Sequence, residues 1–322
     1  MLHCKITQNS RLKQMINNIL IYRSPLNGYG TTTDKARAYP MYIREAEGGN
    51  VEAQVKLCQD YFYGNTFLPK DYNECARWGE EALMSGNESV KFNVAYASAN
   101  IGNKDRAYEL YMEMAENGNS AAMNNLGCLE KDTKKAAEWF LKAADKGDEV
   151  AQKNIARYYR YGIAVEKDTQ KAVEYYIKSA NQGYIDAIVE LAKIYRDGSC
   201  VEKDEAESVR WFEKAVDKGH TESMIQLASL YLKGTFVCKD IDKAIHYYKL
   251  AAEKGDEQAL LCLGNIYDEG VVVKLNKRKA IYWYRKAAAA GNKTAKENLK
   301  RLGVNWMENG RIENDFDEEN ER

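Results

Sequence analysis

Few residues of this sequence have the types and the spacing that chemistry requires. Ser10 and Lys13 stand in the order S-x-x-K, the spacing of the nucleophilic serine and its lysine in serine β-lactamases. The companion elements S-D-N and K-T-G do not occur in the chain. The three histidines, His3, His220 and His246, are too far apart in sequence to indicate a ligand set. We therefore expect no catalytic residues, no metal site and no cofactor, and a hydrolase built on Ser10 is kept as an alternative.

The cysteines also give no sign of a metal or redox site. There are seven, which is an odd number, and the two nearest in sequence, Cys58 and Cys75, are seventeen positions apart. The absence of any C-x-x-C pair excludes the usual zinc-knuckle and thioredoxin-type patterns. Scattered thiols of this kind are typical of small core residues in a reducing compartment. We expect reduced cysteines, and a disulfide framework is the alternative.

Charge and hydropathy limit the classes of protein to which this chain could belong. The 322 residues include 47 basic and 48 acidic side chains, so there is no global field to attract nucleic acid or an anionic membrane. The apolar patch from Ile16 to Tyr22 is interrupted by Asn17 and Asn18, which makes it unsuitable as a signal-peptide core or a membrane span. We expect a cytoplasmic protein that is not inserted in a membrane.

The elements that must position any site are revealed by glycines that recur with a small or polar residue after them. The last four intervals between these glycines are each 36 residues long. Such self-similarity at a fixed period is the signature of a repeat architecture. The recurring glycines are Gly49, Gly86, Gly118, Gly147, Gly183, Gly219, Gly255 and Gly291.

Each repeat predicts two short helices. In one copy Ala259, Leu263 and Tyr267 follow Gly255 at steps of four, which places them on one helical face. A second glycine, such as Gly270, follows fifteen places after the first, where a helix ending in left-handed geometry favours a residue without Cβ. Equivalent aspartates then stand where they can cap a second helix: Asp168, Asp204 and Asp240.

The second helix carries an aromatic pair flanked by small residues, as in Tyr247-Tyr248 followed by Ala251-Ala252. Helices of about fourteen residues are too short to be stable alone, so neighbouring repeats must cover their apolar faces. The units that end at Gly118 and Gly147 are short by four and seven residues. Because the helix positions keep their phase there, we expect tight turns near residues 103–104 and 130–132.

The pattern A-x-x-x-L-x-x-x-Y-x-x-G-x-x-V-x-x-D-x-x-K-A-x-x-(W/Y)-(Y/F) resembles the Sel1-like repeat, a relative of the tetratricopeptide repeat. The resemblance implies an all-α fold, a right-handed α-solenoid of helix-turn-helix repeats. We expect an N-terminal cap with a degenerate repeat over 1–48 and seven repeats over 49–303. These start near 49, 86, 118, 147, 183, 219 and 255, and a capping helix begins at 291. Residues 304–322 form an acidic tail, which we expect to be disordered.

The resemblance also implies a function, that of an adaptor or scaffold for other proteins and not of an enzyme. If the first helix of each repeat lines the inner surface, residues seven and ten places after the anchor glycine point away from its apolar face. These form the predicted binding surface for a protein or peptide: Asn93, Tyr96, Asn125, Asn154, Arg157, Glu190, Lys193, Gln226, Ser229 and Asn265.

Two other functions stay open as alternatives. Some relatives of this repeat family are described as β-lactamase-like, which would give Ser10 and Lys13 a role in cell-wall hydrolysis. The stretch from Arg157 to Ile163 interleaves cations with aromatic rings, as a surface for single-stranded nucleic acid does. Tyr158 and Tyr159 occupy core positions of the repeat, however, so we expect both to be buried and the stretch to be structural.

Overall fold

The structure is a computed structural model that describes residues 32–234, 237–270 and 272–305. The described part contains helices and turns but no β-strand. Its helices group into two compact units that divide between Gly147 and Asp148, and each is described by itself. The S-x-x-K motif at Ser10 and most of the acidic tail lie outside the described residues.

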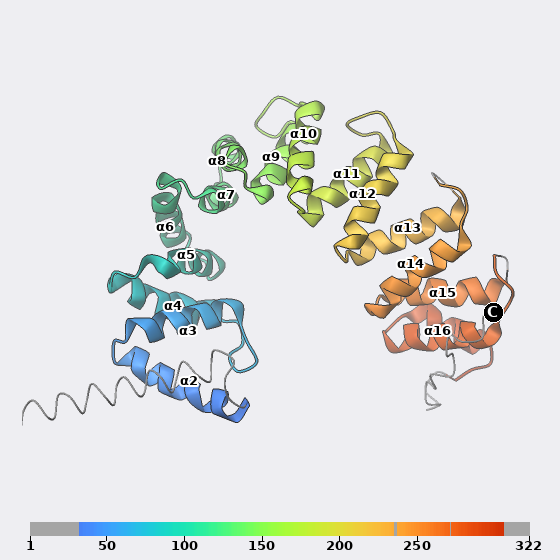
Figure 1. Cartoon of the computed structure of the whole chain (residues 1–322), viewed down its shortest axis with the longest axis horizontal. Coiled ribbons are helices and arrows are strands. Elements are labelled where there is room, and N and C mark those ends of the chain that lie inside the picture. Colours follow the sequence, from blue (N-terminus) through green and yellow to red (C-terminus); the bar gives the residue numbers. More distant parts are fainter. Residues whose placement is uncertain (1–31, 235–236, 271, 306–322) are drawn as a thin grey trace, which may run out of the picture. The chain divides into compact units, whose positions relative to one another are not determined.

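The first unit consists of short helices, each packed against its neighbours in sequence (Figure 1). Three-residue connections at 101–103 and 130–132 confirm the predicted tight turns. The elements are α2 (Thr32–Glu47), α3 (Val51–Tyr63), α4 (Tyr72–Met84), the 3-10 turn η1 (Glu88–Val90), α5 (Lys91–Asn100), α6 (Lys104–Glu116), α7 (Ser120–Leu129) and α8 (Thr133–Asp145).

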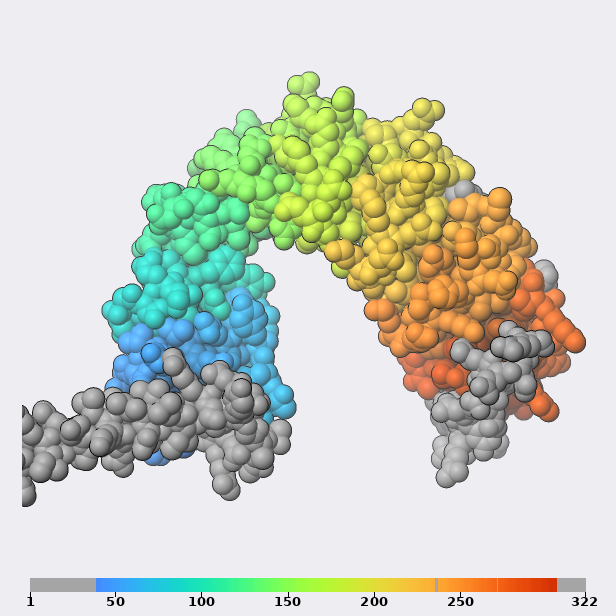
Figure 2. Space-filling view, in the orientation of Figure 1, coloured from blue at the N-terminus to red at the C-terminus, as the bar shows by residue number. Residues whose placement is uncertain are grey.

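The second unit repeats one helix pair with little variation. Within it the closest helix contacts join the two helices of a pair, and weaker ones join consecutive pairs. The space-filling view shows consecutive pairs of the unit in direct contact (Figure 2). Its helices are α9 (Glu149–Tyr161), α10 (Thr169–Asn181), α11 (Ile185–Asp197), α12 (Glu205–Asp217), α13 (Thr221–Lys233), α14 (Ile241–Glu253), α15 (Glu257–Glu269), α16 (Lys277–Ala289) and α17 (Lys293–Arg301).

Helix ends form where the sequence predicts them. The Asp204 side chain accepts a hydrogen bond from the backbone N–H of Glu207, which caps α12, and Asp168 and Asp240 cap α10 and α14 in the same way. Gly198 ends α11 with a φ of 65°, a left-handed conformation that residues with a Cβ rarely adopt. These caps satisfy the backbone groups that every short helix leaves open at its ends.

The core alternates large and small residues. Tyr176, Phe212, Tyr248 and Tyr284, the second members of the aromatic pairs, are all buried. A glycine inside α15 makes room for one of them, because a Cβ on Gly264 would lie 2.4 Å from the Tyr284 ring. The close packing of short helices therefore depends on small residues beside large ones.

Two expectations about burial need correction. Cys58 and Cys75 are buried with their sulfur atoms 3.5 Å apart, but Cys128 and Cys238 are exposed and are not core residues. Tyr158 and Tyr159 are half-buried, not buried. The Tyr159 ring stacks on Tyr175 at 6.0 Å and carries Lys171 Nζ over it at 5.4 Å, so it packs at the edge of the core.

Candidate functional site

The ten residues of the predicted binding surface lie on α5, α7, α9, α11, α13 and α15, the first helices of successive pairs. Arg157 is exposed, and the other nine are half-buried. Their contacts with neighbouring repeats decide how much of each side chain is left for a ligand.

In the first unit, Tyr96 belongs to an aromatic cluster that spans three helices. Its ring centroid lies 5.4 Å from that of Phe62 on α3, in an edge-to-face arrangement, and 5.8 Å from that of Tyr72 on α4. Such aromatic pairs stabilise packing beyond the area that they bury. Tyr96 therefore holds two repeats together and exposes only part of its ring.

In the second unit, Glu190 is the centre of an ion-pair network. Its carboxylate lies 2.8 Å from the guanidinium of Arg160 on α9 and 3.1 Å from Lys193 Nζ on its own helix. Arg160 also donates to Ser199 Oγ at 3.2 Å. The Arg160 and Glu190 side chains keep 13% and 28% of their exposure, so water screens this pair less than an ordinary surface pair. Glu190 is thus engaged within the chain.

Asn265 is engaged in a similar way at the end of the unit. Its Oδ1 accepts a hydrogen bond from Tyr284 Oη on α16 at 2.7 Å and another from Asn298 Nδ2 on α17 at 3.4 Å. Tyr284 Oη also lies 3.2 Å from the Asp268 carboxylate, which pairs with Arg301. Burial and the Asp268 carboxylate raise the pKa of Tyr284. Asn265 therefore fixes the last three helices and is not an open ligand group.

The remaining predicted residues have less extensive contacts. Gln226 donates to Glu222 one turn earlier, at 2.7 Å. The Asn93 Nδ2 atom is buried and has no hydrogen-bond partner among the described residues, an arrangement that costs free energy. The half-buried members Asn125, Asn154 and Ser229 complete the set.

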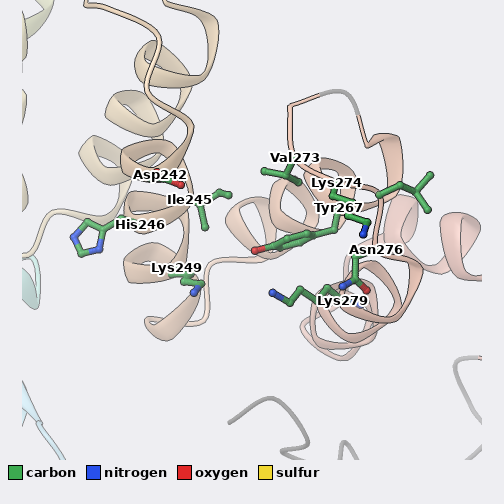
Figure 3. Close-up of a pocket in the computed structure, with 10 residues that line it drawn as sticks. Asp242, Ile245, His246, Lys249, Tyr267, Val273, Lys274, Asn276 and Lys279 are labelled. Atoms are coloured by element: carbon green, nitrogen blue, oxygen red, sulfur yellow. Dashed lines mark hydrogen bonds between the residues drawn. The ribbon is translucent and has the colours of Figure 1, made fainter. Parts of the chain in front are cut away.

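Sequence reasoning missed a cleft of about 550 Å³ in the second unit. It lies between α14 and the α15–α16 hairpin, and Figure 3 shows Ile245 and Lys249 of α14 facing Tyr267 and Lys279 across it. Lys279 Nζ lies 5.2 Å from the centroid of the Tyr267 ring, a cation–π contact. The cleft was not predicted because its walls come from the second helix of one repeat and the connection of the next.

The nucleic-acid alternative gains little from the arrangement of its residues. Arg160 is paired with Glu190, and Tyr159 is stacked on Tyr175. Arg157 and Tyr161 are exposed, Tyr161 by 60%. A strand-binding surface needs several accessible rings in a row, and this stretch offers one exposed ring, that of Tyr161, and others that pack on the fold.

Comparison with known families decides what the repeats are. The Sel1 repeat profile matches residues 51–87, 120–148, 150–184, 185–220, 221–256 and 258–292, more than half of the chain. The chain belongs to the Sel1 repeat family. The profile does not match the segment from 88 to 119, which contains the shortened pair α5 and α6. Sel1 repeat proteins are generally scaffolds for protein interactions.

Known structures and a curated protein resemble this Sel1 repeat chain. A Sel1 repeat protein from Oxalobacter formigenes is 27% identical, with a TM-score of 0.68 over 93% of this chain and 90% of that one. A protective antigen of uropathogenic Escherichia coli is 28% identical, with a TM-score of 0.62 over 82% of this chain and 59% of that one. The chitin synthase regulator of Saccharomyces cerevisiae is 32% identical over 42% of this chain, and the match spans 22% of the regulator.

Two other kinds of site are absent from the part of the chain that the structure describes. Within the described residues, no three His, Cys, Asp or Glu side chains gather closely enough to hold a metal ion. None of the helices described is both long enough and apolar enough to cross a membrane. Among these residues, the face of the first helices and the cleft beside Tyr267 are the features that suit a ligand.

Proposed function

We propose that this Sel1 repeat chain is an adaptor or scaffold that binds a partner protein or peptide on the face formed by its first helices. The observation that carries the proposal is the repetition itself. Polar side chains in the same phase recur on successive first helices, at Asn154 and Arg157, at Glu190 and Lys193, and at Gln226 and Ser229. A partner that follows the repeats meets a similar pattern of groups at each step.

The magnitudes favour a partner that contacts several repeats. A hydrogen bond to one side chain contributes about 0.5–1.5 kcal/mol net. Glu190 is already bound to Arg160, so its contribution to a partner is smaller than that of the exposed Arg157. Useful affinity therefore requires contacts added over consecutive repeats, which suits an extended segment or a broad protein surface.

Site-specific photo-crosslinking tests the proposal. A photoreactive amino acid placed at Arg157, on a first helix, should trap a defined partner from cells of the source organism. The same amino acid placed at Lys178, an exposed position on the second helix α10, is the matched control and should trap much less of it. Equal trapping at both positions, or no specific product at any first-helix position, would contradict the proposed face.

A further inference from the structure

The cleft between α14 and the α15–α16 hairpin has a distinctive charge. Three lysines line it, Lys249, Lys274 and Lys279, against one acidic residue, Asp242. These lysines and Asp242 give the lining a net positive charge. A positively charged concave surface attracts an anionic ligand, and the low-dielectric walls of a cleft strengthen that attraction.

Basic residues are concentrated in the α15–α16 hairpin and the start of α17. Eight Lys or Arg residues and no Asp or Glu stand between Glu269 and Glu297, in a chain whose formal net charge is −1. Helix α16 alone contains five basic residues and no acidic ones. Within the described part of the chain, Lys274, Lys277 and Arg278 form no ion pair, so their charge is not neutralised by a neighbour.

The cleft also has an apolar border. Leu275 is 52% exposed, and Ile245 and Val273, which also line the cleft, are half-buried. The phosphate backbone of a nucleic acid would make no favourable contact with these aliphatic side chains. A peptide can satisfy both parts, with carboxylates near the lysines and an aliphatic side chain against Leu275.

The local extent of the charge argues against a nucleic acid. Strand-binding proteins usually track the phosphate backbone with a long basic groove and stack bases on open rings. Here the lysines that line the cleft come only from α14 and the adjoining α15–α16 hairpin, and the Tyr267 ring is already covered by Lys279 at 5.2 Å. The dimensions and composition suit a short segment of polypeptide.

We propose that this cleft binds a short acidic segment of a partner protein that carries one aliphatic side chain. Its carboxylates pair with Lys249 and Lys274, and the aliphatic side chain packs on Leu275. The inference rests on the proposed function, since it gives the chemistry of one partner segment for a protein-binding repeat array.

The test uses the full chain and a short fluorescent peptide of glutamate and aspartate with one central leucine. We expect fluorescence anisotropy to detect binding that weakens as salt is added, and no binding of the counterpart made of glutamine and asparagine. The double variant Lys249→Glu with Lys274→Glu should lower the affinity for the acidic peptide by about tenfold or more, because two attractions become repulsions.

The matched control is Lys178→Glu with Lys218→Glu, which changes the net charge equally at two exposed positions of the same unit, one on α10 and one just after α12. It should leave the affinity within about twofold, because screening limits the reach of distant surface charges. Leu275→Ser should lower the affinity by about threefold, the effect of a partly lost apolar contact. Unchanged melting temperatures would show that the variants remain folded.

Several results would overturn the inference. Equal losses in the two double variants would show a general charge effect, and no loss with Leu275→Ser would remove the aliphatic contact. Tighter, cleft-dependent binding of a single-stranded RNA or of anionic vesicles would assign the cleft to another class of ligand. Binding seen only after removal of residues 306–322 would assign it to the acidic tail of the chain itself. If the peptide fails to bind while Arg157 still traps a partner, the cleft assignment falls and the protein-binding function stands.

Discussion

The Arg160 guanidinium lies 2.8 Å from the Glu190 carboxylate, so an ion pair joins the first helices of two consecutive repeats. In an array of repeats each unit contacts only its neighbours, and stability is close to a sum of repeat terms and interface terms. A single partly buried pair at such an interface therefore affects how strongly two repeats fold as one. The Glu190 carboxylate of this pair also affects Tyr176 on α10, since burial and the nearby Glu190 raise the pKa of Tyr176 to about 12.

Breaking this pair should weaken the second unit. We expect Glu190→Gln to lower the free energy of unfolding by about 1–2 kcal/mol, because Arg160 then loses its charged partner in a half-buried place. Lys193→Ala is the control, and we expect a loss of about 0.5 kcal/mol or less because Lys193 is 43% exposed. Urea denaturation followed by circular dichroism measures both. Equal losses would mean that Arg160 gains nothing from Glu190.

The glycine that ends α11 should not tolerate a branched side chain. Gly198 has a φ of 65°, and a Cβ there would lie 3.3 Å from Lys203 Cβ. We expect Gly198→Val to cost about 2 kcal/mol or more, because left-handed geometry is unfavourable for L-residues and worst for branched ones. Gly198→Asn should cost about half as much, since asparagine adopts this geometry more readily. A melting temperature for Gly198→Val equal to that of Lys193→Ala would refute the assigned helix end.

The N-cap of α13 can be improved. His220 Nδ1 accepts from the backbone N–H of Ser223 at 3.2 Å, whereas the aspartates that cap α9 and α15 accept at 2.7 and 2.8 Å. We expect His220→Asp to stabilise the protein by about 0.5–1 kcal/mol, since a carboxylate bonds the first turn and complements the helix dipole. His220→Ala should destabilise it by about 1 kcal/mol through loss of the cap. Thermal unfolding near neutral pH distinguishes the two, and a destabilised His220→Asp protein would count against this account.

The buried tyrosines predict sensitivity to alkali. Burial and the nearby Glu190 raise the pKa of Tyr176 to about 12 in the folded protein, from 10.0 for an unperturbed tyrosine. As the pH rises, the unfolded chain loses the Tyr176 proton before the folded protein does. The contribution of Tyr176 to the free energy of unfolding is therefore complete below pH 10 and is lost as the pH rises from about 10 to about 12. The loss is on the order of 2 kcal/mol for this residue. Denaturation at a series of alkaline pH values should show a shallower decline for Tyr176→Phe, and identical declines would disprove the link.

Much of the fold could be predicted from the sequence because each repeat is specified by residues that lie close together in the chain. The 36-residue glycine spacing, the capping aspartates and the steps of four between Ala259, Leu263 and Tyr267 each act within one or two helices. Such signals need no knowledge of distant parts of the chain. The shortened repeats were also predictable, since a deletion between helices leaves the phase of each helix unchanged.

Burial within each repeat was harder to predict. Tyr158 and Tyr159 occupy core positions by pattern, yet both stay half-buried, because pattern gives the direction of a side chain and not the cover that a neighbouring repeat supplies. The same reason applies to Cys128 and Cys238, which are exposed although their residue type is typical of cores.

The sequence by itself determined the helix pairs, their caps and the family, because periodicity and capping are local properties of the chain. Tertiary structure decided which side chains are available. It joined Glu190 to Arg160 across thirty positions and Asn265 to Asn298 across thirty-three, and it formed the lysine-lined cleft beside Tyr267. These contacts depend on the distance between neighbouring helices, which packing sets and which no local spacing in the sequence specifies.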